Sequence, residues 1–323
     1  MEFKKHIFEE KEYLNSPKYE KDKLYWQGVF TPLMADLNVP SPNLSGYRST
    51  FFISEKRTTD IQHFCESLSI TKNAFYMGIY ILYIYKIKGL TDIVVGNPVL
   101  GRSGRKERGI FGMFMNAMPL RYQINSGEPI ADYFRNIDKK LKKNFAHQKY
   151  PYNHIIRDLS LGYQPLYTTC VNYYNTKMAD HFAGKPVTYL EFYNGEQEYD
   201  LQLIIRDWQD DLRTQIDIDC KTDYLSPDLL MEMFRRLEMI IDCCIRGSYQ
   251  LISSISLLTP AERSSQLAQF NNTYSEPLSE TIVDVFLKQV KLTPDRCAVK
   301  DEKESLTYSD LFTRAFALTN WLC

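Results

Sequence analysis

The sequence predicts a mixed fold of the α/β or α+β class, built around a substantial sheet. Segments with helical periodicity and short β-branched segments follow one another between residues 47 and 258, which is typical of helices packed on a sheet. The 323 residues, of which 44% are hydrophobic, suffice to form a buried core. The longest apolar run, residues 74–85, is too short to cross a bilayer and predicts a buried helix.

Charge and cysteine content narrow the class of protein further. The 39 basic and 40 acidic side chains nearly cancel, so no net field favours nucleic acid or a membrane as a partner. The seven cysteines are odd in number and lack the spacing of zinc ligands, which indicates reduced thiols and neither a metal site nor a disulfide framework. The first residues lack the apolar core of a signal peptide, so a cytoplasmic location is expected.

The first elements are predicted from composition and capping residues. Residues 1–28 form a charged helical segment, and residues 31–46, rich in Pro, Ser and Asn, form a surface linker. Residues 47–54 alternate as a strand does. A helix ending at about Leu68 is expected to start at Thr58 or Thr59, because a hydroxyl there can accept a bond from a free backbone N–H.

The elements that follow continue the mixed order. Thr71 can cap a second helix, which Gly89 ends. The strand expected at residues 109–124 is broken by Gly112 and Pro119 in this prediction. Further helices are expected at residues 129–146 and 226–246, and further strands at 92–102, 109–124, 165–175, 187–193, 200–208 and 212–220.

The character of the chain changes after about Leu258. Residues 259–280 combine a short helix with a polar connector. A new unit of helix, two strands and helix begins at Thr281. The sequence ends inside the last helix, whose apolar face would have nothing to pack against, so the unit is expected to be incomplete.

Several sequence blocks, taken in order, resemble the condensation domains of non-ribosomal peptide synthetases. They are "VVGNPVLGR" (94–102), "GMFMNAMPLR" (112–121), "HQKYPYN" (147–153) and "RDLSLGYQPL" (157–166). Any one of these blocks alone would be a weak signal, but their order over about 250 residues is specific. The tail, from "LTPAERSSQLAQFNNT" onward, is similar to the linker and the start of an adenylation (AMP-binding) domain.

The resemblance implies a domain organisation. Residues 1–46 correspond to the segment between the family's two lobes and a linker. Residues 47–258 correspond to the C-terminal lobe, an α/β sandwich of the chloramphenicol-acetyltransferase type. Residues 259–280 are a linker, and residues 281–323 are the truncated start of an adenylation domain.

The stretch "NHIIRDL" (153–159) is similar to the family's catalytic motif, His-His-x-x-x-Asp-Gly, only by chance. This stretch has no Gly for a tight turn and predicts a helical turn after Pro151. The five histidines are isolated from one another in the sequence, and His154 is expected to pack rather than to act as a base. No catalytic residue is therefore assigned in this chain, although an acyltransferase using His154 remains an alternative.

By resemblance, the parent protein forms amide bonds between carrier-bound thioesters, and this chain supplies one wall of the substrate tunnel. Asn116 either faces that tunnel or satisfies local backbone groups at a strand end. Arg102 either pins its loop or is a surface charge, and Arg157 and Asp158 either pair across a lobe contact or cap a helix. The other residues that the motifs single out are expected to shape the backbone or fix the structure: Gly96, Pro98, Gly101, Gly112, Phe114, Pro119, Arg121, His147, Gln148, Tyr150, Pro151 and Pro165.

The resemblance also implies partners and cofactors for the parent protein. The partners are peptidyl carrier domains, the N-terminal lobe of the condensation domain and the rest of the adenylation domain. The carriers bear phosphopantetheine, and the adenylation domain uses ATP and magnesium, while no cofactor is expected on this chain. Alone the chain is expected to be inactive. The alternative function is that of a non-catalytic lobe that docks a carrier or another synthetase chain.

Overall fold

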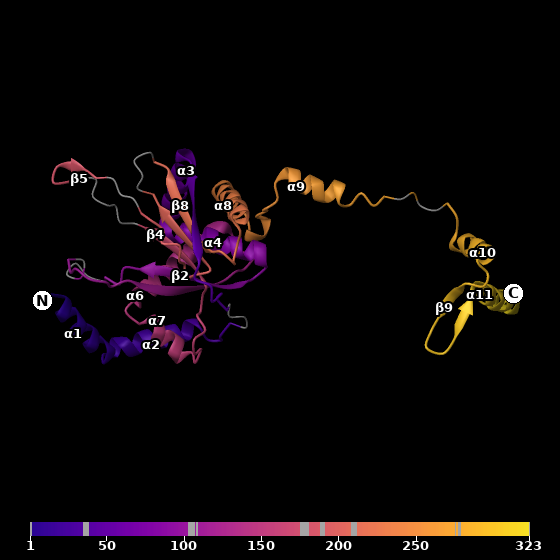
Figure 1. Ribbon diagram of the computed structural model, residues 1–323, viewed down its shortest axis with the longest axis horizontal. Helices are drawn as coiled ribbons and strands as arrows, with labels where there is room; N and C mark the ends of the chain where they lie inside the picture. The colour runs from indigo at the N-terminus through magenta and orange to yellow at the C-terminus, as the bar shows by residue number, and fades with distance from the viewer. Residues whose placement is uncertain are drawn as a thin grey trace. The chain divides into compact units, whose positions relative to one another are not determined.

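The computed structural model describes residues 2–34, 39–102, 107, 109–174, 181–187, 191–207, 212–274, 276 and 279–322. The chain divides into two compact units, Met1–Leu257 and Leu258–Cys323. Figure 1 labels their elements.

The first unit is built on a mixed sheet of six strands in the order β1-β8-β7-β4-β2-β3. The central strand β4 runs parallel to both β2 and β7, whereas the other neighbours are antiparallel. The strands are β1 (Gly46–Ile53), β2 (Asp92–Val99), β3 (Asn116–Gln123), β4 (Thr169–Tyr174), β7 (Leu201–Arg206) and β8 (Thr214–Lys221), and a separate hairpin pairs β5 (His181–Phe182) with β6 (Lys185–Pro186).

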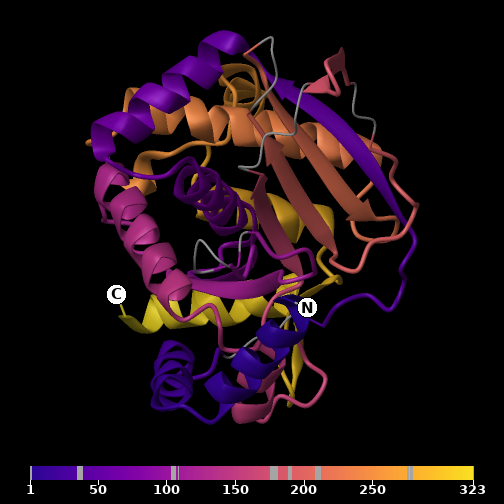
Figure 2. The same ribbon diagram turned by 90° about the vertical axis from the view of Figure 1, so that its left-hand side faces the viewer.

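Four helices cover one face of this sheet: α3 (Glu55–Leu68), α4 (Lys72–Lys88), α6 (Ile130–Ala146) and α8 (Pro227–Arg246) (Figures 1 and 2). The central helix α4 contacts β2 and β4, while α6 contacts β3 and α8 contacts β1. Buried apolar side chains such as Ile81, Ile137 and Ile218 fill this interface. The apolar periodicity that predicts these helices therefore faces the sheet.

The other face of the sheet is covered only in part among the described residues. Helices α2 (Pro17–Val29) and α7 (Tyr152–Asp158) contribute to a second apolar cluster with Trp26, Val94 and Met118. Alternate residues of β2 point to opposite faces, so Ile93 and Val95 join the main core instead. Helix α1 (Glu2–Leu14) packs on α2, and a short 3-10 turn, Ile252–Ser254, follows α8.

Two of the predicted helix boundaries are confirmed and one is wrong. Thr71 accepts a bond from the backbone N–H of Ala74 and caps α4, and Gly89 ends that helix with a φ of 70°. Helix α3, however, begins at Glu55 and is capped by Ser54, not by Thr58 or Thr59. Ser54 comes directly after β1 and is the first hydroxyl able to satisfy the free N–H groups.

The predicted strands need three corrections. β3 begins at Asn116, and residues 109–115 form no strand. Pro119 does not break β3 but lies within it, opposite Gly96; this is possible because β3 is the edge strand and one side of it needs no N–H donor. Of the strand expected at 187–193, residues 188–190 lie outside the described residues and the remainder is not a strand.

The second unit contains a capped helix, a two-stranded sheet and a final helix, as the sequence predicts. Its elements are α9 (Pro260–Ser264), a π-helical turn (Ser265–Gln269), α10 (Ile282–Leu292), β9 (Cys297–Lys300), β10 (Ser305–Thr307) and α11 (Tyr308–Leu322). Its large apolar side chains, Ile282, Leu292 and Trp321 among them, are exposed. Over the described part of both units, no helix is long and apolar enough to span a membrane.

Candidate functional site

Asn116 lies where two of the sequence blocks meet. It begins β3, and its side-chain Oδ1 accepts a bond from the backbone N–H of Ala117 at 3.0 Å. Its Nδ2 lies 3.4 Å from the carbonyl oxygen of Gln148 and 3.5 Å from that of Tyr150. The amide therefore satisfies local backbone groups, as one of the two interpretations predicts, and it joins β3 to the turn before α7.

The loop between β2 and β3 is held together by Arg102. Its guanidinium donates to the carbonyl oxygens of Glu107, Ile110 and Gly112, and it lies 4.0 Å from the centre of the Phe114 ring. Arg102 thus pins the loop rather than serving as a free surface charge. Gly101 has a φ of 65°, and a Cβ there would lie 1.8 Å from the Phe114 carbonyl oxygen, so only glycine fits.

Arg121 anchors the segment that follows α2 to the sheet. Its guanidinium pairs with the Asp92 carboxylate at 2.6 Å and donates to the carbonyl oxygens of Val29 and Pro32 at 3.0 and 2.7 Å. Every one of these contacts is internal to the fold. The side chain therefore acts on structure and not on a ligand.

His147 is part of a buried polar cluster under α2. Its Nδ1 lies 2.5 Å from the carboxylate of Asp22, and its ring stacks on Tyr25 at 3.9 Å. Asp22 is completely buried and also accepts bonds from Tyr13 and Lys18. The cluster fixes α1 and α2 against the end of α6.

The stretch that carries His154 is a helix packed into the unit. Its Nδ1 lies 2.9 Å from the Tyr19 hydroxyl, and its ring meets the Tyr150 ring edge to face. Burial, followed by the charge of Arg157, lowers the pKa of His154. Asp158 accepts a bond from the buried Tyr150 hydroxyl and pairs with its neighbour Arg157 at 3.1 Å. Pro151 caps this helix without a side-chain bond.

A hollow of about 600 Å³, here called the tyrosine hollow, opens beside Asn116. It includes Asn116 together with Pro98 and Pro165, two other residues of the motif blocks. The described residues that line it are Pro40, Pro98, Met115, Asn116, Ala117, Tyr152, Tyr163, Pro165, Tyr167, Thr168, Asn172, Glu198, Tyr199 and Gln202.

The tyrosines of this hollow are fixed by their own contacts. The Tyr152 hydroxyl accepts a bond from the Leu166 N–H at 2.9 Å, and the Tyr167 hydroxyl donates to the Ala117 carbonyl at 3.3 Å. Tyr167 packs against Tyr152 and Tyr199, with ring centres 5.2 and 6.0 Å apart. Burial raises the pKa of Tyr152 to about 12, so its hydroxyl stays protonated. Tyr152 and Tyr167 are therefore held in place, and the Tyr152 hydroxyl carries no charge.

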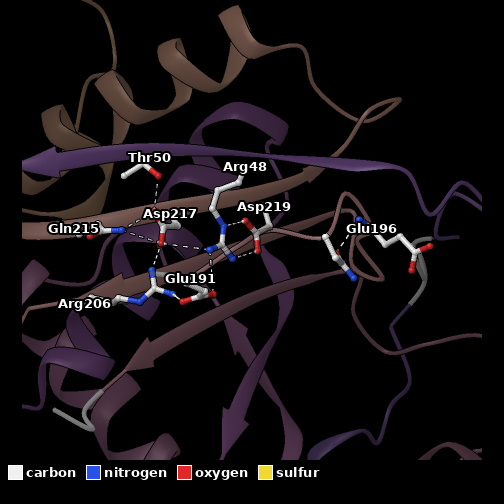
Figure 3. Close-up of polar contacts among 9 residues, drawn as sticks. Arg48, Thr50, Glu191, Glu196, Arg206, Gln215, Asp217 and Asp219 are labelled. Carbon is white, nitrogen blue, oxygen red and sulfur yellow. Dashed lines mark hydrogen bonds and ion pairs between the residues drawn. The ribbon is translucent and has the colours of Figure 1, made fainter. Parts of the chain in front are cut away.

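A network of charged side chains adjoins the hollow on the same sheet face (Figure 3), because Asp219 of the network lies opposite Gln202 of the hollow. Arg48 on β1 makes a two-pronged contact with Asp219 on β8, at 2.6 and 2.9 Å. Asp217, which is almost completely buried, accepts bonds from Thr50 and Gln215 and pairs with Arg206. These partners come from three adjacent strands.

Glu191 joins the two arginines of this network. It pairs with Arg48 at 3.0 Å and also with Arg206, although 57% of its side chain is exposed. The arginines, in turn, lie near the Tyr193 and Tyr174 rings. Two arginines thus bind three carboxylates in the network, which ties Glu191 to the sheet.

The sequence prediction misses both of these regions, for different reasons. A signal for the network exists, because Gln215, Asp217 and Asp219 alternate with apolar residues in β8; this pattern indicates that one face of the strand is polar. No comparable signal exists for the hollow. Glu198 and Gln202 lie before and on β7, Asn172 lies on β4, and only the strand order brings Asn172 to the other two. Within the described residues, no group of three or more potential metal ligands is present.

Comparison with known families gives one match over most of the chain. The family described as "Condensation domain" matches residues 1–267. Surfactin synthase subunit 1 of Bacillus subtilis (strain 168) is 26% identical over 330 residues, which is 98% of this chain and 9% of that protein. Gramicidin S synthase 2 of Brevibacillus brevis is 26% identical over 316 residues, which is 94% of this chain and 7% of that protein. The chain thus spans less than a tenth of the length of these relatives.

Solved structures show the same fold. The first condensation domain of the calcium-dependent antibiotic synthetase aligns with a TM-score of 0.70 at 20% identity, covering 78% of this chain and 57% of that one. A four-domain nonribosomal peptide synthetase bound to AMP and glycine aligns with a TM-score of 0.68 at 15% identity, covering 93% of this chain and 25% of that one. The mixed α/β fold is therefore that of condensation domains.

Proposed function

The chain belongs to the condensation domain family, and from this we propose that it forms one wall of a site where an amide bond is made. In this proposal, the amine of one carrier-bound aminoacyl group attacks the thioester of another, and the thiol of the second carrier leaves. The chain corresponds to the C-terminal lobe. Its share of the work is to position the two tethered substrates, which alone can contribute much of a rate enhancement.

The observation that carries the proposal is the meeting of two motif blocks at Asn116, on the rim of the tyrosine hollow. The β3 block and the turn after α6 are far apart in sequence, yet the Asn116 amide bonds the carbonyl groups of Gln148 and Tyr150. The same residue lines the hollow. An amide in this position holds the wall in shape and also presents a polar group at its edge.

We assign the proton-transfer step to a segment other than this chain. The family motif needs two adjacent histidines, and the 323 residues contain no such pair. His154 is engaged with Tyr19 and is not among the residues that line the hollow. The chain alone is therefore expected to make no amide, and the parent protein to make it when an N-terminal lobe supplies the pair.

We propose further that residues 281–323 begin an adenylation domain. Two observations support this. Alignments with the synthetases reach 94–100% of the chain, beyond the family match at residue 267. The apolar side chains of α10 and α11 are exposed, as expected where more of a domain would cover them. Phosphopantetheine, ATP and magnesium then belong to the parent's carrier and adenylation domains.

The proposal is tested with the longest continuous reading frame that contains these residues. It is mixed with donor and acceptor carriers loaded with aminoacyl groups, and amide product is measured by mass spectrometry. Product is expected from the long frame and not from the 323 residues alone. Asn116→Ala in the long frame should lower the rate about three- to tenfold, because one net hydrogen bond is worth about 0.5–1.5 kcal/mol. Asn136→Ala, on α6 and away from the hollow, is the matched control.

The same experiment separates the alternative function. If the long frame binds loaded carriers but makes no product, the chain is a docking lobe and the catalytic assignment fails. Turnover by the 323 residues alone would overturn the assignment of proton transfer to another segment. The coding sequence on both sides tests the domain order directly, since it should encode the histidine pair upstream and further adenylation sequence downstream.

A further inference from the structure

The tyrosine hollow contains polar groups that the fold does not use. Among the described residues, the carboxylate of Glu198 and the side-chain amides of Asn172 and Gln202 have no hydrogen-bond or ion-pair partner. By contrast, the carboxylates of Asp217 and Asp219 on the same sheet face are each bonded to an arginine. Glu198 is exposed and the two amides are half-buried, so all three are open to a ligand that enters the hollow.

The charge of the hollow favours one sign of ligand. Glu198 is its one carboxylate, and none of the described lining residues is Lys, Arg or His. The amide oxygens of Asn172 and Gln202 are additional acceptors. A cation can pair with all three, whereas an anion would be repelled and an apolar group would leave them unpaired.

The aromatic wall favours the same class of ligand. Tyr199 is half-buried and presents an electron-rich ring, which attracts a cation, and the buried Tyr167 packs behind it. Their positions are fixed by ring contacts and by the bond from Tyr167 to Ala117, so little order is lost on binding. The volume of about 600 Å³ is within the usual range for small-molecule sites.

We propose that the tyrosine hollow binds the side-chain ammonium of a basic amino acid, such as lysine or ornithine, between the tyrosine rings and Glu198. Taken with the proposed function, on which this assignment to a substrate rests, the ammonium belongs to the carrier-bound group that is joined. The hollow then makes the wall selective for a positively charged residue.

Binding to the 323-residue chain tests this without any turnover. The probes are lysine and norleucine, each capped as the Nα-acetyl N-methylamide, which differ in the ammonium group. Affinity is measured by NMR titration. The lysine probe should bind at least about tenfold more tightly than the norleucine probe, because a hydrogen bond to a charged group is worth about 1.5–3 kcal/mol.

Two variants locate the effect. Glu198→Gln keeps the shape and removes the charge, and it should abolish most of the preference for lysine. Glu196→Gln, two residues away and outside the hollow, should leave the preference intact. The proposal is overturned if norleucine binds as tightly as lysine, if neither probe binds to the folded chain, or if Glu198→Gln keeps the full preference. Because no carrier is present, failure of the condensation assay leaves this result unaffected, and the reverse also holds.

Discussion

The charged network and the tyrosine hollow lie on the same face of one sheet, and they differ in how their polar groups are partnered. Arg206 and Gln202 show this on a single strand, since both are on β7 and four residues apart, so they share a face. Arg206 is bonded to Asp217 and Glu191, whereas Gln202 lines a hollow. Paired charges hold the fold, and unpaired groups remain available to a ligand.

The largest effect is expected where a paired charge is removed from the network. Asp217→Ala leaves Arg206 buried without its main partner, and it also deprives Thr50 and Gln215 of an acceptor. Breaking a buried pair in this way costs about 3 kcal/mol or more. The free energy of unfolding, measured in urea by circular dichroism, should fall by that amount.

The matched control is Glu191→Gln in the same network. Its carboxylate is 57% exposed, and exposed ion pairs contribute at most about 1 kcal/mol. If the two variants lose equal stability, burial does not distinguish the groups of the network, and the comparison with the hollow loses its basis.

A smaller effect is expected from a change in the wall of the hollow. A Cβ at Gly96 would lie 2.3 Å from a Tyr167 ring carbon, so Gly96→Ala should displace that ring. Overpacking of this kind costs about 1–3 kcal/mol, and the near-ultraviolet circular dichroism of the tyrosines should change. Gly28→Ala, where nothing lies within 4 Å of the added Cβ, is the control. An unchanged spectrum for Gly96→Ala would show that Tyr167 is not fixed there.

The smallest effect concerns His154, a packed group outside both regions. Burial lowers its pKa in the folded state, so between its ordinary value of about 6.5 and the lower folded value only the unfolded chain takes up the proton. The stability it contributes is intact above about pH 6.5 and decreases as the pH falls below it. His154→Asn should remove this part of the slope in a pH series of urea unfolding.

The matched control for this pH series is His63→Asn, because His63 is exposed. A slope unchanged by His154→Asn would contradict the packed, neutral state of His154. If His154→Asn removes that part of the slope, His154 is neutral and packed in the folded chain, like the partnered groups of the network.

The sequence predicts helices best where a local hydrogen bond decides the boundary. Thr71 sets the start of α4 and Gly89 sets its end, each through contacts within a few residues. Ser54, Thr58 and Thr59 are all competent caps, and the end of β1 at Ile53, which decides between them, depends on pairing with a distant strand. In the same way, Pro119 is tolerated because β3 is at the edge of the sheet, and strand order is not visible in local pattern.

The candidate site follows the same rule. Asn116 is predicted because it belongs to a motif block, and its neighbours in space, Gln148 and Tyr150, belong to another. Glu198 belongs to no block and to no periodic segment. It reaches the hollow only because the chain returns from β4 to β7 through this segment and the two strands pair in parallel.

The pairing of β1 with β8 has a consequence for how the protein is made. Gly46 lies opposite Lys221, so the edge strand leaves the ribosome long before its neighbour exists. At about 5–20 residues per second the wait is on the order of 10–30 s. During that time β1 presents unpaired backbone groups to other nascent chains, and the charge of Arg48 on this strand is the kind of feature that hinders wrong pairing. The residue that later pairs with Asp219 is thus the one charged side chain of this edge strand.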